Sequence, residues 1–209
     1  MPLQNRVTPF GELIATPARG TLMGNRGCLH DATRRIRRPF AVKRWIICVL
    51  EFKGRHRTVM APGQYTELFF LDEATALAAG HRPCAECQRG RYDIFRAHWA
   101  GRGRPRPSAD DMDDVLHAER LDRRRTKRTY TARVSQLPRG AMVADGAGRA
   151  YLVETGALLP WSPDGYGTHV RRPAATRYRV LTPRSIVRAL ARGYPVTVHV
   201  SARQGGVPA

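Results

Sequence analysis

The stretch "GHRPCAEC", residues 80–87, carries two of the four cysteines in this chain of 209 residues. Cys84 and Cys87 are separated by two residues and follow the helix-like run "LDEATALAA". A C-x-x-C pair that opens a helix can point both sulfurs at one metal ion. A redox dithiol usually follows a strand in a βαβ unit, whereas a helix precedes this pair. We therefore predict a metal site here, with the chain folded closely around it.

A tetrahedral zinc ion needs two further ligands, and several residues could supply them. Cys28 and His30 lie in the glycine-bounded loop "GCLHD", which is flexible and polar enough to bind a metal. Cys48 lies in "RWIICVLEF", residues 44–52, whose β-branched and aromatic residues predict a buried strand. A lone cysteine in such a strand is more often a small buried hydrophobic residue than a ligand. The predicted zinc ligands are Cys28, His30, Cys84 and Cys87, with Cys48, His56 and His81 as alternatives.

A longer stretch, "FFLDEATALAAGHRPCAEC" at residues 69–87, resembles the second half of the Ada-type metal-binding domain. The shared features are a strand ending in Phe, a short helix rich in Glu and Ala, and Arg-Pro-Cys-x-x-Cys before a closing helix. In that family four cysteines bind zinc, the domain binds DNA, and one cysteine of the first pair takes a methyl group from a damaged phosphate. The resemblance implies that Cys84 and Cys87 are the second ligand pair, and that the protein contacts DNA.

The first pair of that family, two cysteines three residues apart, has no counterpart in this sequence. Cys28 would have to replace it, together with His30 or with Cys48. A stoichiometric alkyl acceptor at Cys28 is therefore one hypothesis for this chain, beside a DNA-binding protein that takes part in repair or in recognition of modified DNA.

The charge of the chain independently predicts a polyanionic partner. Lysine and arginine total 36 against 17 acidic residues, a formal net charge of +19, and only three of the basic residues are lysines. The arginine fork holds phosphate with two hydrogen bonds, so this excess favours nucleic acid, with DNA the better candidate. The predicted phosphate contacts are Arg34, Arg35, Arg37, Arg38, Arg123, Arg124, Arg125, Lys127 and Arg128.

An enzyme that acts on nucleic acid is the alternative function. In "LHAER", residues 116–120, helical spacing puts His117 one turn from Asp113, Asp114 and Arg120, while Glu119 projects at a different angle on a nearby face and Lys127 follows shortly. Such a set could serve a metal-dependent nuclease or a base-processing enzyme. An amphipathic helix that exposes the same residues to solvent explains the pattern equally simply. No nucleophile elbow and no phosphate-binding glycine loop occurs in the sequence, so other hydrolase classes lack support.

The pattern of elements predicts an α+β fold in two closely packed halves. Residues 1–104 would form a zinc-stabilised module of strands and helices that contacts DNA. Residues 105–209 would form a second α+β half with a small antiparallel sheet, helices and a basic helix end. Helices are predicted after caps at Asp72 and Thr182 and across residues 110–125, with a hairpin at "DGAG" and a final strand over 196–200.

No run of the sequence approaches the roughly 20 apolar residues of a membrane helix, and the first residues lack the pattern of a secretory signal. We therefore expect no membrane partner and a cytoplasmic location. Four irregularly spaced cysteines in a chain of this size fit free thiols or metal ligands better than a disulfide framework.

Overall fold

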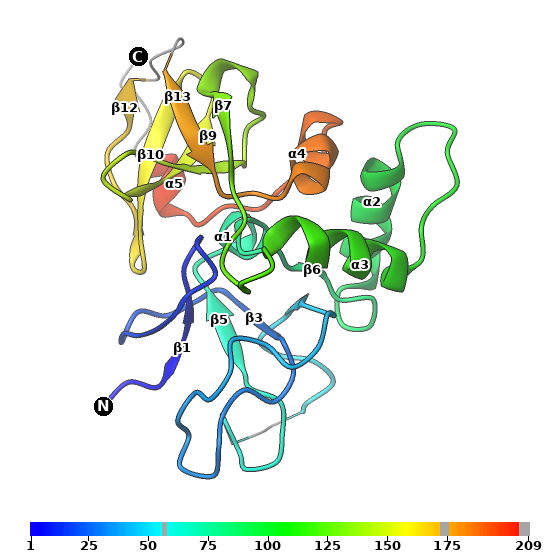
Figure 1. Cartoon of the computed structure of the whole chain (residues 1–209), viewed down its shortest axis with the longest axis vertical. Coiled ribbons are helices and arrows are strands. Elements are labelled where there is room, and N and C mark those ends of the chain that lie inside the picture. The colour runs from blue at the N-terminus through cyan, green and yellow to red at the C-terminus, as the bar shows by residue number, and fades with distance from the viewer. Residues whose placement is uncertain (56–57, 172–175, 205–209) are drawn as a thin grey trace.

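The computed structural model describes residues 1–55, 58–171 and 176–204, and it shows the predicted α+β class. Figure 1 shows the N-terminal strands β1, β3 and β5 in one part of the molecule and the C-terminal strands β7, β9, β10 and β13 in another. Helix α1 lies between the two groups of strands, and α2, α3 and α4 lie together beside it (Figure 1).

The N-terminal sheet has six short strands in the order β2-β1-β5-β3-β4-β6. Two pairs, β1 with β5 and β4 with β6, are parallel, and the other neighbours are antiparallel. β3 passes so close to β4 that a Cβ atom on Gly24 would lie 2.1 Å from the carbonyl oxygen of Ile46. The strands are β1 (Gln4–Val7), β2 (Leu13–Ala15), β3 (Leu22–Asn25), β4 (Ile46–Cys48), β5 (Leu68–Phe70) and β6 (Arg82–Pro83).

The C-terminal sheet is antiparallel at every pairing among the described residues, with the order β11-β10-β9-β8-β13-β7 and β12 paired to β10. The predicted hairpin at residues 145–148 joins β8 to β9, and Asp145 closes it by accepting the amide of Arg149 (2.9 Å). The strands are β7 (Tyr130–Arg133), β8 (Met142–Ala144), β9 (Ala150–Glu154), β10 (Ala157–Ser162), β11 (Gly165–Tyr166), β12 (Val170–Arg171) and β13 (Arg177–Val180), and a 3-10 turn, η1 (Val134–Gln136), follows β7.

The helices begin at side-chain caps that the sequence partly predicts. Asp72 caps α1 by accepting the amide of Thr75 (2.8 Å), as expected. The helix predicted over 110–125 begins at a capping box on Ser108 and ends at Arg120. Thr182 accepts the amide of Met142 (2.8 Å) instead of capping the last long helix. The helices are α1 (Glu73–Ala78), α2 (Arg89–Ala100), α3 (Ala109–Arg120), α4 (Arg184–Ala191) and α5 (Ser201–Gln204).

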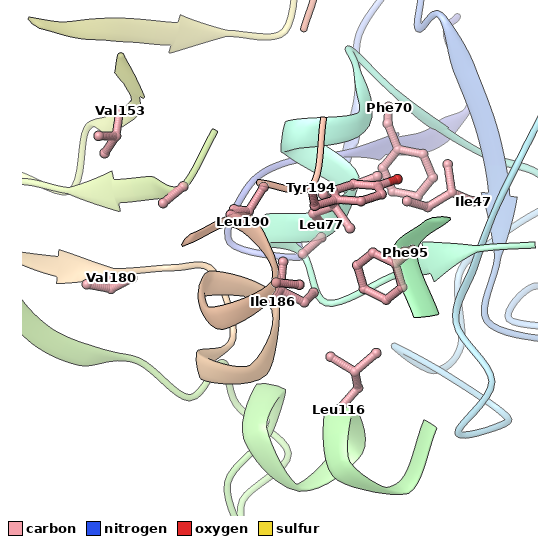
Figure 2. Packing of buried hydrophobic residues seen from close by; sticks show 14 of the residues in the cluster. Ile47, Phe70, Leu77, Phe95, Leu116, Val153, Val180, Ile186, Leu190 and Tyr194 are labelled. Carbon is pink, nitrogen blue, oxygen red and sulfur yellow. The ribbon is translucent and has the colours of Figure 1, made fainter. Parts of the chain in front are cut away.

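One hydrophobic core draws side chains from both predicted halves. Figure 2 shows Leu77 of α1 and Phe95 of α2 packed near Ile186 of α4, with Leu116 of α3 at the other side. Ile47, Phe70, Val153, Val180, Leu190 and Tyr194 belong to the same cluster. The segments 1–104 and 105–209 therefore share their interior, and α1 lies at the centre of it.

The strand predicted over residues 196–200 does not form. Its amides are taken by two buried carboxylates at the start of α1 instead. Glu73 accepts the amide of Thr197 (2.8 Å), and Asp72 accepts the amide of His199 (2.9 Å). These contacts join the C-terminal segment to the N-terminal half. Across the described ranges, no helix combines the length and the apolar character needed to cross a membrane.

Candidate metal centre and arginine loops

Three cysteines meet beside the N-terminal sheet. The Sγ atoms of Cys48, Cys84 and Cys87 all lie within 4.8 Å of one another. Cys48 and Cys84 are buried, Cys87 is half-buried, and all three are free thiols. In the part of the chain that the structure describes, no histidine, aspartate or glutamate joins this thiol group. The donors are soft sulfur atoms, which suit zinc and other thiophilic ions.

Strand pairing explains why Cys48 joins the predicted pair. β4 and β6 run parallel, with Ile46 opposite Arg82 and Ile47 opposite Pro83. The residues that follow these pairs are Cys48 and Cys84, so the two sulfurs come to the same level of the sheet. The Cys84 amide donates to the carbonyl of Ile47 (2.9 Å), which fixes this register.

The proximity of the thiols changes their acidity. Hydrogen bonding from the Cys48 thiol lowers the pKa of Cys84 to about 5, and the amide of Glu86, 3.4 Å from the Cys84 sulfur, adds to the effect. The Cys48 bond likewise lowers the pKa of Cys87. The pKa of Cys48 is raised because its proton is held between the other two sulfurs and because it is buried. Thiolate is the form that binds a metal, so Cys84 and Cys87 are prepared as ligands.

The structure corrects the rest of the predicted ligand set. Cys28 does not belong to the thiol group, and its sulfur lies 3.7 Å from the carbonyl oxygen of His30. The ring nitrogens of His30 lie 2.6 Å from the Thr66 hydroxyl and 3.2 Å from the Ala61 carbonyl oxygen, so both have partners. These contacts hold the loop in place and leave no ring nitrogen for a metal. His56, a further sequence candidate, lies outside the described residues.

The two basic stretches of the sequence form loops of the same construction, the arginine loops 31–38 and 122–128. In the first, Asp31 accepts the amides of Thr33 (2.9 Å) and Arg35 (3.1 Å). In the second, Asp122 accepts the amides of Arg124 (2.8 Å) and Thr126 (2.9 Å). These bonds, with those of the threonine hydroxyls, lower the pKa of both aspartates.

Each arginine loop contains one arginine whose backbone angles lie in the left-handed region, where residues other than glycine are uncommon. Arg34 and Arg125 both have φ of 62°. The guanidinium carbon of Arg125 lies 4.7 Å from the centre of the Phe40 ring, which closely follows the first loop, so the two loops are neighbours. Six of the predicted phosphate contacts, Arg34, Arg35, Arg38, Arg123, Arg124 and Arg125, are exposed and form no ion pair with the described acidic residues.

Two other predicted phosphate contacts are partly engaged within the protein. Arg37 pairs with Asp31, its Nε lying 2.6 Å from the carboxylate, and Arg128 donates to the carbonyl of Ala118 (2.9 Å). Both side chains remain on the exposed side of their loops.

Lys127 belongs instead to a buried cation group, which we define as the buried Arg26, Arg82 and Arg120 together with the half-buried Lys127. Lys127 donates to the carbonyl of Ala78, and Arg120 donates to that of Gly80 (2.9 Å), both at the end of α1. Burial and the nearby cations of Arg26 and Arg120 lower the pKa of Lys127 to about 7. The side chain is thus engaged at the end of a helix, and its roles as a phosphate contact and as a catalytic residue stay predictions.

The other two predicted catalytic residues also have structural partners. Glu119 accepts the amide (2.8 Å) and the hydroxyl (2.6 Å) of Ser185 and so caps the start of α4. The His117 ring packs edge-on against Phe40, with its Nδ1 3.2 Å from Arg120, and burial lowers its pKa. His117, Glu119 and Lys127 are thus held in separate contacts, and the structure lends no support to a shared site.

Comparisons with protein-family models, with curated proteins and with solved structures find no match for this chain. The resemblance to the Ada-type metal-binding domain therefore stays a prediction. The function has to be argued from the thiol group and the arginine loops themselves.

Proposed function

We propose that this chain is a zinc-containing protein that binds nucleic acid, with DNA as the partner, and that it serves the recognition or repair of modified DNA. The arginine loops carry the proposal. They are neighbouring loops with six exposed arginines that form no ion pair with the described acidic residues, and phosphates are the partners that such guanidinium groups bind best.

The thiol group supports the zinc part of the proposal. Three sulfur ligands from two segments converge on one point, and two of them have pKa values shifted toward the thiolate. In the family that residues 69–87 resemble, cysteine ligands bind zinc in a DNA-binding domain. Here Cys48 supplies a ligand in place of the predicted Cys28 and His30.

A salt titration of DNA binding tests the nucleic-acid part. Neutralising phosphates releases counterions, so log K should fall with log salt concentration by about 0.9 for each phosphate contact. A variant with Arg34→Gln and Arg124→Gln should bind a duplex more weakly and show a slope smaller by about 1.8.

The matched control carries Arg139→Gln and Arg149→Gln, which remove the same charge from the C-terminal sheet. These arginines are paired with Glu154 (2.6 Å) and Asp145 (2.8 Å). The control should keep the wild-type slope. Equal losses in the two variants would show that total charge, and not the arginine loops, binds the DNA.

The stoichiometric alkyl acceptor remains a sequence-based prediction. Because Cys28 lies outside the thiol group, a metal bound there gives its thiol no activation. Mass spectrometry after incubation with methylated DNA tests it directly, and we expect no mass gain on Cys28.

A further inference from the structure

The thiol group supplies three ligands, one fewer than a closed tetrahedral site needs. Structural zinc sites use four protein ligands, whereas catalytic ones use three and leave the fourth position to water or substrate. Cys48, Cys84 and Cys87 line a pocket of about 320 Å³. This volume is at the lower end of the range for small-molecule sites. A metal held by the three sulfurs would therefore border a space that a small molecule can enter.

A buried carboxylate lines the same pocket. Glu67 is 4% exposed, and it does not belong to the thiol group, whose ligand atoms lie within 4.8 Å of one another. Its Oε2 accepts the amide of Met60 (2.7 Å), a residue with φ of 54°. A strained conformation of this kind persists only where the surrounding structure requires it. Glu67 is thus a held carboxylate that lines the same pocket as the three sulfurs without belonging to the thiol group, as a general base would.

The walls and the mouth of the pocket suit a planar ring attached to a phosphate. Phe52 and Phe69 line the pocket with apolar surface. Lys53 and Arg55 are exposed and lie over the Phe52 ring, at 5.2 Å and 5.3 Å from its centre, and Arg55, which lines the pocket, also pairs with the exposed Glu86 (3.1 Å). A nucleobase could enter between aromatic side chains while these cations hold its phosphate.

We propose that this pocket is a hydrolytic site that removes the exocyclic amine of a nucleobase, an inference that rests on the nucleic-acid-binding function proposed above. Zinc deaminases combine three such ligands, a P-C-x-x-C motif and a glutamate that is not a ligand, and they act on bases outside the stack. Their glutamate lies two residues after the first ligand, a position that Leu50 occupies here, so Glu67 would supply the carboxylate from another segment. Residues 83–87, "PCAEC", have that motif. A bound metal would supply Lewis acidity that makes water a stronger nucleophile at neutral pH.

Glu67 carries the proton in this reaction. Its carboxylate takes one proton from the attacking water and delivers it to the departing nitrogen. A C–O bond forms at the carbon that bears the amine, the C–N bond breaks, and ammonia leaves. The second proton of the water ends on the ring nitrogen, so the reaction requires no oxidant or reductant.

The test uses the full chain loaded with zinc and oligonucleotides that contain cytosine and adenine, both as single strands and as mismatched duplexes. Ammonia release and the mass of the product nucleosides report conversion of amine to carbonyl. Glu67→Gln keeps an acceptor for the Met60 amide and should slow the reaction by roughly 10²–10⁴-fold. Its zinc content and DNA affinity should be unchanged, and the exposed Glu51→Gln should match the wild type in all three measurements.

A second measurement, the visible spectrum of the metal site, tests the open coordination position in the wild-type protein without substrate turnover. With cobalt(II) in place of zinc, imidazole should change the visible spectrum, because an open position accepts an added ligand. An unchanged spectrum would mean that a fourth protein ligand closes the site, and this result overturns the proposal. Absence of amine loss from every oligonucleotide overturns it as well. Loss of salt-dependent DNA binding is measured separately and would overturn the proposed function instead.

Discussion

The thiol group and the buried cation group flank the same two short strands, β4 and β6. They differ in the partners that their polar atoms have. The amides of Arg82 and Cys84 donate to the carbonyls of Trp45 (3.1 Å) and Ile47 (2.9 Å), so one ladder positions both groups. At one end the thiols border a pocket. At the other end the guanidinium groups of Arg26 and Arg120 lie on either side of the Trp45 ring, each 4.0 Å from its centre.

Most polar atoms of the cations have partners within the protein, although the buried Nη2 of Arg26 and Nε of Arg120 have none among the described residues. Backbone carbonyls at the end of α1 accept from Arg120 and Lys127, and Asp113 accepts from Arg82 in two bonds of 2.9 and 2.7 Å. The thiols hydrogen-bond to one another, and a metal ion would replace the protons that these bonds hold. The comparison shows that part of the net charge of +19 stabilises the interior, so charge alone overstates the surface available to DNA.

The largest expected effect on stability concerns the buried cation group. Asp113→Ala leaves Arg82 buried without its carboxylate and should lower the free energy of unfolding by roughly 3–5 kcal/mol. Urea unfolding measures this loss. Asp114→Ala, which breaks the exposed pair with Lys43, should cost less than about 1 kcal/mol. A double variant with Arg82→Met and Asp113→Leu should recover most of the loss, and equal losses in single and double variants would contradict the interpretation.

Metal removal tests the thiol group. Zinc at 100 times its dissociation constant should stabilise the folded chain by about 2.7 kcal/mol, and a chelator should remove this contribution. Cys48→Ser and Cys84→Ser should lose both the bound zinc and the response to the chelator. Cys28→Ser should keep both. Elemental analysis and thermal unfolding measure these outcomes, and loss of zinc in the Cys28 variant alone would contradict the assigned ligands.

His81, a buried histidine that contacts the cation group, predicts that the stability of the chain depends on pH. His81 accepts from Nε of Arg26 (3.2 Å), and burial, with Arg26, Arg120 and Lys127 nearby, holds its pKa well below the usual value of 6.5. Below pH 6.5 the unfolded chain binds a proton that the folded chain does not. Stability should therefore fall with decreasing pH, by up to about 1.4 kcal/mol per pH unit.

The matched variant for this titration is His81→Gln, which keeps an acceptor for Arg26 and does not titrate. Its stability should depend less on pH between about 6.5 and 5.5, while other groups contribute equally to both proteins. Parallel curves for the two proteins would show that His81 is protonated in the folded state.

The smallest expected effect concerns the left-handed arginines. Arg34→Gly removes the backbone strain and should stabilise the chain by about 0.5 kcal/mol, after the greater entropy of glycine in the unfolded state is subtracted. The same change should weaken DNA binding and reduce the salt slope by about 0.9. Loss of both stability and binding would indicate that Arg34 stabilises the fold and does not bind phosphate.

Local pattern was sufficient to predict the α+β class, the cap of α1 and the place of Cys84 and Cys87 in a group that could hold a metal ion. It was insufficient for Cys48, because burial in a strand is compatible both with packing and with ligation. The distinguishing information is the parallel register of β4 and β6, which lie far apart in the sequence. No local periodicity encodes that register.

The same limit explains why the structural contacts of His117, Glu119 and Lys127 could not be predicted. Helical spacing indicates which residues lie near each other on α3, but not what packs against them. Glu119 caps a helix that begins 65 residues later in the chain, at Arg184, and Lys127 reaches the end of α1. Long-range contacts of this kind give polar side chains structural partners, whereas the sequence alone suggests that these side chains form a catalytic site.

The carboxylates of Asp72 and Glu73 have a consequence for how the protein is made. Their partners Tyr166, Tyr194, Thr197 and His199 are translated late. A ribosome that has released only the first hundred residues therefore presents the acidic end of α1 with Arg91 beside Glu73 but without these later partners, and a chain shortened before residue 194 would lack three of them. We expect such truncated chains to be recognised by chaperones and proteases, and the native interior to close only when synthesis is nearly complete.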